Sequence, residues 1–340
     1  MTTAARPTVS VALCTYNGAA YLPAQWQSLL EQQQRPDEVV VCDDRSTDDT
    51  VALLRRLAAD APFPVRVLVN PERLGFNKNF ERALSECTGD LLFICDQDDA
   101  WFPEKIATMT EFMVSHPQYD LAFCDAWVTD EHLRGRQNRF WEWIRFDEPT
   151  QDRWQAGEMM DAMLDGNRVM GCATVIRRSF LPRILPFPEQ LPGYIYDGWI
   201  GLVGAAYQTI AFIDEPLQLY RTHPKQQVGV REAPAPERVR LRDRFVRARD
   251  RKLAPLREIQ AQLATISRLL TKHVPPDAPG LDQLRRRLAH FTMRSHLPPD
   301  RLRRLGPVLA GLQRGNYQRY ADVSANWYAP LLAALGDLLE

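Results

Sequence analysis

The chain has 340 residues, a length that suggests one large domain or two smaller ones. Hydrophobic residues make up 45% of it, which is enough for a sizeable core and too many for a disordered chain. No run approaches the ~18 apolar residues of a membrane-spanning helix, and the opening MTTAARPTVSVALCTY lacks a secretory-signal pattern. Six scattered cysteines without a CxxC pair predict reduced core thiols in a cytoplasmic protein rather than disulfides or zinc ligands.

The formal net charge of −1 hides a strong asymmetry along the chain. Residues 231–340 hold 21 of the 42 Lys and Arg residues but only 11 of the 43 Asp and Glu residues, a formal charge of +10. The remaining residues, 1–230, carry −11. An acidic part suits a metal-using site, whereas a basic part suits a phosphate-bearing or membrane-surface partner. We expect no nucleic-acid partner.

The first 125 residues alternate between strand-length apolar runs and helix-like stretches. The predicted strands are Val9–Cys14, Glu38–Cys42, Val65–Val69, Leu91–Cys95 and Leu121–Cys124, and the predicted helices are Ala19–Gln33, Thr47–Ala59, Phe76–Cys87 and Glu104–Ser115. Ser46-Thr47-Asp48-Asp49 supplies N-cap chemistry for the second helix. Because continuous apolar strands alternate with helices, the pattern predicts an α/β fold with a mostly parallel sheet covered on both faces.

The remainder of the chain divides into an irregular middle and a helical end. The middle holds an aromatic cluster at Phe140–Trp143, Phe146 and Trp154, a pattern typical of a core or an interface, and strand candidates at Ala173–Ile176 and Thr209–Ile213. Arg-rich helical stretches follow, such as Glu237–Leu253 and Leu281–His290, separated by Pro275-Pro276 and Pro298-Pro299. The proline-containing run Arg231–Glu237 marks a boundary, so we predict domains at 1–230 and 231–340.

Polar residues follow each of the first four predicted strands. They are Thr15 and Asn17, then Asp43 and Asp44, then Asn70 and Arg73, and finally Asp96-Gln97-Asp98-Asp99. Ligands of open parallel sheets bind beyond the carboxyl ends of the strands, so this convergence predicts a site. Clustered carboxylates after a buried strand repel one another and are suited to hold a hard divalent cation. A short Asp-rich loop by itself would be a solvated turn, and the polar ends of the neighbouring strands favour the metal site.

Two common phosphate-binding motifs are absent from the sequence. No GxGxxG follows a predicted strand and no GxxxxGK[ST] occurs, which disfavours a dinucleotide dehydrogenase and a P-loop kinase. Phosphates would then need a metal ion and basic side chains instead.

The chain resembles family-2 glycosyltransferases with the nucleotide-diphospho-sugar (GT-A) fold, especially their bacterial rhamnosyltransferase-like members. The matching segments run in the family's order over roughly residues 8–229. They are Val9–Gly18, Val39–Asp48, Asn70–Phe76 with Asn79-Phe80, Asp96–Asp99, Gly171-Cys172, Tyr196–Trp199 and Tyr220–His223. The resemblance implies a GT-A catalytic domain over 1–230, with the α-helical region 231–340 appended to it.

The resemblance also implies a role for individual residues. Donor-binding positions would be Thr15, Asn17, Asp43, Arg45, Arg73, Asp96 and Arg221, metal ligands would be Asp98 and His223, and the catalytic base would be Asp197. Many relatives have His or Glu before that aspartate, where this chain has Tyr196, which weakens inference about the acceptor. In isolation, Asp197 reads as a helix N-cap and His223 as a surface histidine, while Thr15 and Asn17 read as turn residues.

Glycosyl transfer is chemically coherent with this set of residues. A divalent cation, Mg²⁺ or Mn²⁺, stabilises a leaving diphosphate as a Lewis acid, and a carboxylate can deprotonate an attacking hydroxyl. A single base that acts opposite the leaving group inverts the anomeric centre. The expected partners are a dTDP- or UDP-sugar, with rhamnose favoured by the resemblance, and a glycan or lipid-linked glycan acceptor.

Two alternatives remain open from the sequence. A non-catalytic sugar-nucleotide or glycan-binding subunit would share the fold, although the complete set of Asp43, Asp96, Asp98 and Asp197 favours catalysis. A nucleotidyltransferase would need a Gly-rich basic loop after the first strand, which Thr15–Gly18 does not provide. The basic amphipathic stretch Glu237–Leu253 suits either peripheral contact with the cytoplasmic face of a membrane or packing on the acidic domain.

Overall fold

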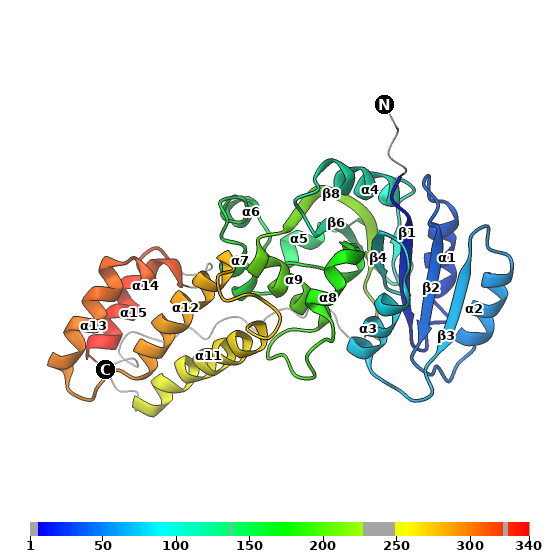
Figure 1. Cartoon of the computed structure of the whole chain (residues 1–340). Coiled ribbons are helices and arrows are strands. Elements are labelled where there is room, and N and C mark those ends of the chain that lie inside the picture. The colour runs from blue at the N-terminus through cyan, green and yellow to red at the C-terminus, as the bar shows by residue number, and fades with distance from the viewer. Residues whose placement is uncertain (1–5, 137, 227–248, 322–325, 340) are drawn as a thin grey trace. The chain divides into compact units, whose positions relative to one another are not determined.

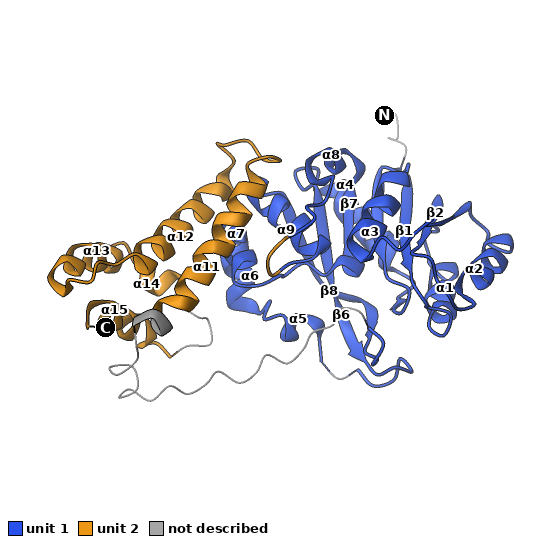
Figure 2. Ribbon diagram, turned by 90° about the horizontal axis from the view of Figure 1, so that it is seen from below, with its two compact units in different colours: residues 1–190, 194–230 blue, residues 191–193, 231–340 orange. Residues whose placement is uncertain are grey.

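The computed structural model describes residues 6–136, 138–226, 249–321 and 326–339. The chain divides into two compact units, which Figure 2 shows in different colours. The first comprises residues 1–190 and 194–230, and the second comprises residues 191–193 and 231–340. The domain boundary predicted at Arg231–Glu237 lies outside the described residues. The short segment Leu191–Gly193 groups with the C-terminal helices, which the sequence did not suggest.

The first unit is built on one mixed sheet (Figure 1). Its strands are β1 Val9–Thr15, β2 Glu38–Asp43, β3 Val65–Val69, β4 Leu91–Cys95, β5 Ala100–Trp101, β6 Leu121–Thr129, β7 Thr174–Arg177 and β8 Ile210–Arg221. The strand order is β3-β2-β1-β4-β7-β6-β8-β5, in which β7 and β5 run antiparallel to their neighbours. All seven predicted strands are present and the mostly parallel sheet is confirmed, whereas the short strand β5 was not predicted.

Helices cover the sheet, as the burial of its central strands shows. Every residue of β1 and of β4 is buried, and since side chains alternate across a strand, both faces must be covered. The helices are α1 Leu22–Leu30, α2 Thr50–Ala59, α3 Phe76–Glu86, α4 Lys105–Ser115, α5 Phe140–Trp143, α6 Glu148–Gln155, α7 Met159–Leu164, α8 Leu181–Ile184 and α9 Tyr196–Tyr207, with 3₁₀ turns η1 Gly171–Ala173 and η2 Arg178–Phe180. Helix α3 packs against β1 and β2, and α4 packs against β6 and β8.

The start of α2 follows the predicted capping chemistry with one change of position. The helix begins at Thr50, and the carboxylate of Asp48 accepts a hydrogen bond of 3.0 Å from the Thr50 backbone N–H. Asp49, which occupies the N-cap position itself, makes no side-chain cap. The capping side chain therefore belongs to Asp48, one residue before the N-cap position.

The aromatic cluster of the middle region belongs to the core. Phe146 and Trp154 are fully buried and contact the ring of Phe123 at centroid distances of 5.3 and 5.7 Å. Trp141 packs edge-on against Phe146 at 4.9 Å. These contacts confirm the core interpretation. All six cysteines are likewise buried and free, as predicted.

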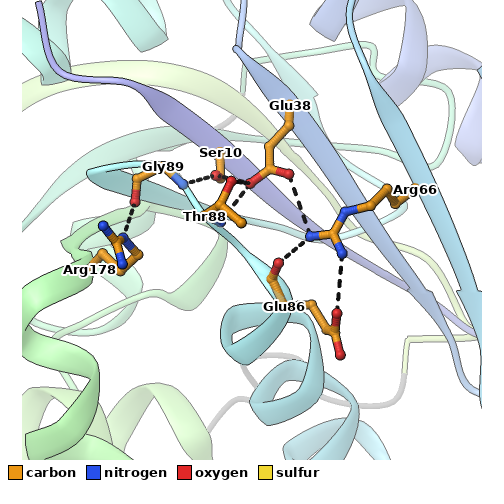
Figure 3. Close-up of polar contacts among 7 residues, drawn as sticks. All are labelled: Ser10, Glu38, Arg66, Glu86, Thr88, Gly89 and Arg178. Atoms are coloured by element: carbon orange, nitrogen blue, oxygen red, sulfur yellow. Dashed lines mark hydrogen bonds and ion pairs between the residues drawn. The ribbon is translucent and has the colours of Figure 1, made fainter.

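A polar network ties the amino ends of the sheet strands together (Figure 3). The Ser10 hydroxyl donates to Glu38 at 2.6 Å and accepts from the Gly89 backbone N–H at 2.8 Å. The hydroxyl and backbone N–H of Thr88 donate to the same Glu38 oxygen, at 2.8 and 2.6 Å. Arg66 forms ion pairs with Glu38 and Glu86. The network lies at the edge opposite the predicted site and joins β1, β2 and β3 to the loop before β4.

The second unit is helical, as predicted. Its helices are α11 Arg249–Leu270, α12 Pro279–Ser295, α13 Arg301–Gln313, α14 Asn316–Arg319 and α15 Ala329–Leu339. Pro275-Pro276 and Pro298-Pro299 lie in the loops on either side of α12, which contains the stretch predicted at Leu281–His290. The helix predicted at Glu237–Leu253 falls mostly outside the described residues and overlaps only the first turns of α11. None of the described helices is long and apolar enough to cross a membrane.

Candidate functional site

The short strand β5 brings the two ends of the candidate site together. β5 follows Asp99 directly and pairs antiparallel with β8, with Ala100 opposite Leu219. Continuing this register by two residues places Asp98 opposite Arg221, the last residue of β8. The Asp-rich segment after β4 therefore meets the polar segment after β8, although 125 residues separate Asp98 from His223.

His223 and Asp98 form a partly buried pair. The imidazole Nε2 of His223 lies 2.8 Å from Oδ2 of Asp98, and the two side chains are 2% and 16% exposed. The ring of Tyr21 packs against the His223 ring at a centroid distance of 4.0 Å and a tilt of 32°, which limits the orientations of the imidazole. The two side chains predicted as metal ligands are therefore in direct contact.

Hydrogen bonds to neighbouring residues hold Arg221 next to this pair. Its Nε donates to the Asp98 carbonyl at 2.5 Å and its Nη1 donates to the Glu131 carbonyl at 2.7 Å. The Arg221 backbone N–H donates to the buried carboxylate of Asp99 at 3.1 Å. The remaining nitrogen, Nη2, is buried and has no hydrogen-bond partner among the described residues, so its donor capacity is unused.

Asp96 faces Asp99 and Cys172. One ligand atom from each of these three residues lies within 4.8 Å of the other two. Cys172 lies beside Asp96 because β7 pairs antiparallel with β4, with Phe93 opposite Val175. Continuing this register by three residues places Cys172 opposite Asp96. Burial and the neighbouring carboxylates raise the pKa of Asp96 well above its usual value and raise the pKa of Asp99 to about 7. The cluster therefore holds carboxyl groups whose charged forms are disfavoured by burial and by one another.

Asp197 lies in the first turn of α9, one residue after Tyr196. Its carboxylate accepts hydrogen bonds from Gly198 N–H at 2.6 Å, from the Asn167 amide at 2.9 Å and from Gly171 N–H at 3.2 Å. Burial raises the pKa of Asp197 to about 6, against the opposing effect of these hydrogen bonds. The N-cap position belongs to Ile195, so the cap interpretation of Asp197 does not hold. Its charge is close enough to contribute to the raised pKa of Asp96.

The predicted donor-binding residues at the ends of β1 and β2 bind one another. The Thr15 hydroxyl donates to Asp43 at 2.7 Å, and Asp43 also accepts from the Ser46 backbone and hydroxyl. The Asn17 side-chain oxygen accepts from the Thr47 N–H at 2.8 Å. Asn17 is exposed and has a positive φ of 49°, so it shapes the loop as well as lying at this edge.

Arg73 and Arg45 lie on the exposed rim of the same edge. The Arg73 guanidinium stacks on the ring of Tyr16 at 4.1 Å, and Arg45 has a positive φ of 63°. The loop that carries Arg73 is anchored by Asp44, whose buried carboxylate accepts from the N–H groups of Leu74 at 2.7 Å and Gly75 at 2.9 Å.

Several residues that sequence reasoning passed over complete the site. Tyr21 supports His223, Asn167 binds Asp197, and Gln218 donates to Asp99 at 3.3 Å. Gln97 lies between Asp96 and Asp98, and its side-chain amide forms hydrogen bonds with the backbone N–H and carbonyl of Tyr16. Only Gln97 lay inside a recognised motif. The others lie in segments whose local sequence carries no signal of the site.

This arrangement of a mostly parallel sheet with carboxylates at its carboxyl edge defines the GT-A class of nucleotide-sugar transferase folds. The *S. aureus* protein TarS, residues 1–349, solved in complex with UDP-GlcNAc, superposes with a TM-score of 0.53 at 18% identity, covering 97% of this chain and 81% of that one. The family model for glycosyl transferase family 2 matches residues 10–181. The chain therefore belongs to glycosyl transferase family 2.

Two relatives illustrate the range of similar sequences. An uncharacterized protein of *Mycobacterium tuberculosis*, Rv1520, is 25% identical over 219 residues, which cover 63% of this chain and 59% of that protein. The dTDP-rhamnosyl transferase RfbG of *Shigella flexneri* is 25% identical over 228 residues, covering 64% of this chain and 73% of that one. The chain thus spans less than two thirds of the length of its mycobacterial relative.

Proposed function

We propose that the chain is an inverting, metal-dependent glycosyltransferase that moves a sugar from a nucleotide-diphosphate donor to a hydroxyl of an acceptor. The observation that carries the proposal is the meeting of Asp98 and His223 beside the carboxylates of Asp96 and Asp99, with Asp197 close by. This edge of the sheet offers oxygen and nitrogen ligands for a cation. It also holds the unpartnered Nη2 of Arg221 and the carboxylate of Asp197, whose pKa is about 6.

The chemistry of the donor set fits Mg²⁺ or Mn²⁺. Asp98 would be the direct ligand, with His223 completing the set and Asp96 lying near the ribose and the metal. Burial and, after it, the neighbouring carboxylates raise the pKa values of Asp96 and Asp99, and a bound divalent cation would favour their charged forms. The bound ion supplies Lewis-acid stabilisation to the departing diphosphate. Arg221, through its unpartnered Nη2, would hold a phosphate oxygen.

Asp197 would act as the general base. A base performs best when its pKa lies near the working pH, and a value of about 6 leaves the carboxylate ionised at neutral pH. The hydrogen bonds from Asn167 and Gly171 orient the carboxylate. Asp197 takes the proton of the acceptor hydroxyl as that oxygen bonds to the anomeric carbon. Attack from the side opposite the diphosphate inverts the configuration.

The donor and the acceptor are proposed as classes. Thr15, Asn17, Asp43, Arg45 and Arg73 would surround the base and diphosphate of a dTDP- or UDP-sugar. The similarity to RfbG, described as a dTDP-rhamnosyl transferase, supports rhamnose as the sugar. The acceptor would be a glycan or a lipid-linked glycan, and the enzyme would act in the cytoplasm with peripheral contact to the inner face of the cell membrane.

The alternative is a non-catalytic subunit that binds sugar nucleotides or glycans. Binding alone would not require a carboxylate with the raised pKa and the hydrogen-bonded orientation of Asp197, and this observation favours the enzyme.

A donor panel tests both functions. The full-length protein is incubated with dTDP-rhamnose, UDP-glucose, UDP-GlcNAc and GDP-mannose, each with Mg²⁺, with Mn²⁺ or with EDTA. Binding is measured by calorimetry and donor cleavage by release of nucleoside diphosphate. We expect one donor class to be cleaved only with a metal ion, and an inverted anomeric product by NMR once an acceptor is found. Tight donor binding without cleavage under any condition would identify the binding subunit instead.

A further inference from the structure

Helix α13 exposes a row of leucines on one face. Leu302, Leu305 and Leu309 are 76%, 42% and 49% exposed, and spacings of three and four residues put them on the same side of the helix. On another face of α13, Val308 is fully buried in a small core with Leu297, Tyr317 and Ala334. The helix thus already has an inner apolar face, and the leucine row is additional to it.

Helix α15 repeats this arrangement. Leu331, Leu335 and Leu339 are exposed at intervals of four residues, while Ala334 is buried in the same small core. Helices α13 and α15 pack against each other. Directly before α15, Trp327 is 81% exposed and Tyr328 is 42% exposed. We call the six leucines with these two aromatic residues the apolar patch.

The apolar patch concentrates the exposed hydrophobic residues of the molecule. Of the eleven large hydrophobic side chains that are exposed in the described part of the chain, eight belong to it. The other three, Val69, Leu74 and Val114, are in the first unit. Scattered apolar residues are normal on a protein surface, but exposed apolar rows on two helices that pack against each other mark a contact surface.

The exposed charges described on the helices of the patch are mostly positive. Within residues 301–321 and 326–339, the exposed charged side chains are Arg301, Arg303 and Arg314. The one described acidic residue in these ranges, Asp337, is buried and paired with Arg294. Asp300, just before α13, lies 3.5 Å from Arg303, but both side chains are exposed, so this ion pair is weak. The partner of the patch should therefore be both apolar and anionic.

We propose that the apolar patch of α13 and α15 is the surface by which the protein binds an anionic lipid bilayer. Leucines that enter the acyl region, Trp and Tyr at the headgroup level and arginines facing anionic headgroups are the elements of peripheral membrane binding. A second copy is a poorer occupant, because a two-fold contact would set arginines against arginines, and Asp300 is the one exposed carboxylate described beside α13 that could pair with them. This inference rests on the membrane contact in the proposed function and assigns that contact to the apolar patch.

Vesicle flotation of the full-length protein tests the proposal, with no donor present. The vesicles are phosphatidylcholine alone, and phosphatidylcholine with one quarter phosphatidylglycerol, at low and high salt. The patch variant combines Leu302→Ser, Trp327→Ser and Leu331→Ser, all at strongly exposed positions. Its matched control is Val114→Ser, a residue of the first unit that is 57% exposed. A charge variant, Arg301→Glu with Arg303→Glu, is paired with Arg55→Glu on α2.

We expect the wild type to float with anionic vesicles and less with neutral ones. The patch variant should lose at least about tenfold in partition coefficient, since each buried apolar group contributes to insertion. The charge variant should lose binding mainly at low salt, and both controls should bind like the wild type. Equal binding of the patch variant and the wild type would overturn the proposal. So would a wild-type dimer in sedimentation equilibrium that the patch variant dissolves. Either result leaves the transferase proposal intact, because donor cleavage is measured separately.

Discussion

The imidazole Nε2 of His223 and the carboxylate Oδ2 of Asp98 lie 2.8 Å apart, joining the segment after β8 to the segment after β4. Tyr21 packs against the imidazole and Arg221 donates to the backbone carbonyl of Asp98, so the imidazole and the backbone of Asp98 each have a further contact. A preorganised nitrogen and oxygen pair of this kind loses little conformational entropy when it binds a cation. The proposed metal dependence rests on this pair.

Asp98→Asn should abolish metal-dependent donor cleavage and leave the fold intact, because the amide replaces a charged oxygen ligand with a neutral one. His223→Gln should keep some activity but require a higher metal concentration. Metal titrations monitored by nucleoside diphosphate release measure both effects. His132→Gln, at an exposed histidine in the loop after β6, serves as the control. Full wild-type activity in excess EDTA would show that the metal assignment is wrong.

Asp197→Asn should lower kcat by ~10²–10⁴-fold, which is the usual contribution of a proton-transfer catalyst. Donor affinity should change little, since the base acts on the acceptor hydroxyl. Steady-state kinetics with calorimetric donor binding separate the two quantities. Asp60→Asn, at an exposed residue after α2, should behave like the wild type. A variant that transfers sugar at near wild-type rates would eliminate Asp197 as the base.

Asn167→Ala should move the acidic limb of the kcat/KM profile to higher pH. Activity requires ionised Asp197, so it rises with pH through the carboxyl pKa of about 6. The Asn167 amide donates to the charged form of Asp197 and thereby lowers that pKa, so its removal raises the pKa. A pH–rate profile of the free enzyme measures the change, with Asn138→Ala as a control. An unshifted profile would mean that Asn167 does not tune the base.

Ser10→Ala should lower the free energy of unfolding by about 1–3 kcal/mol, because it leaves the Gly89 N–H without its acceptor and removes a donor from Glu38. Burial opposes the charge of Glu38, yet the hydrogen bonds from Ser10 and Thr88 lower its pKa overall. This contribution is complete above the usual glutamate pKa and is lost as pH falls through the lowered folded value. Denaturant unfolding is measured from pH 3 to 7, with exposed Ser179→Ala as the control. The free energy of unfolding should fall less towards low pH in Ser10→Ala than in the wild type.

His290 should make the second unit sensitive to acid. Burial and the charge of Arg294 lower its pKa to about 4, and neither ring nitrogen has a hydrogen-bond partner among the described residues. The folded state therefore resists protonation, so stability falls as pH drops from about 6.5 towards 4, by on the order of 3 kcal/mol. His290→Leu should flatten this dependence in thermal unfolding scans, whereas exposed His296→Gln should not. An equally steep dependence in His290→Leu would assign the acid sensitivity elsewhere.

The local sequence was sufficient to locate the strands and to bring four polar segments to one sheet edge. The apolar runs Val9–Cys14 and Leu91–Cys95 form strands as their length and composition predict, and parallel strands place their carboxyl ends together. The Asp cluster after β4 therefore indicated a site before any distance was known. The buried cysteines and the aromatic core followed from composition and spacing in the same way.

Only the tertiary structure decided which distant residues meet at that edge. The two-residue strand β5 is too short to produce a pattern, yet its pairing with β8 sets Asp98 beside His223. The reversed strand β7 sets Cys172 opposite Asp96, and Asn167 reaches Asp197 from a loop without a motif. These contacts depend on strand order and register, which are set by the packing of the whole sheet, whereas the sequence pattern specifies only each segment's own conformation and exposed face.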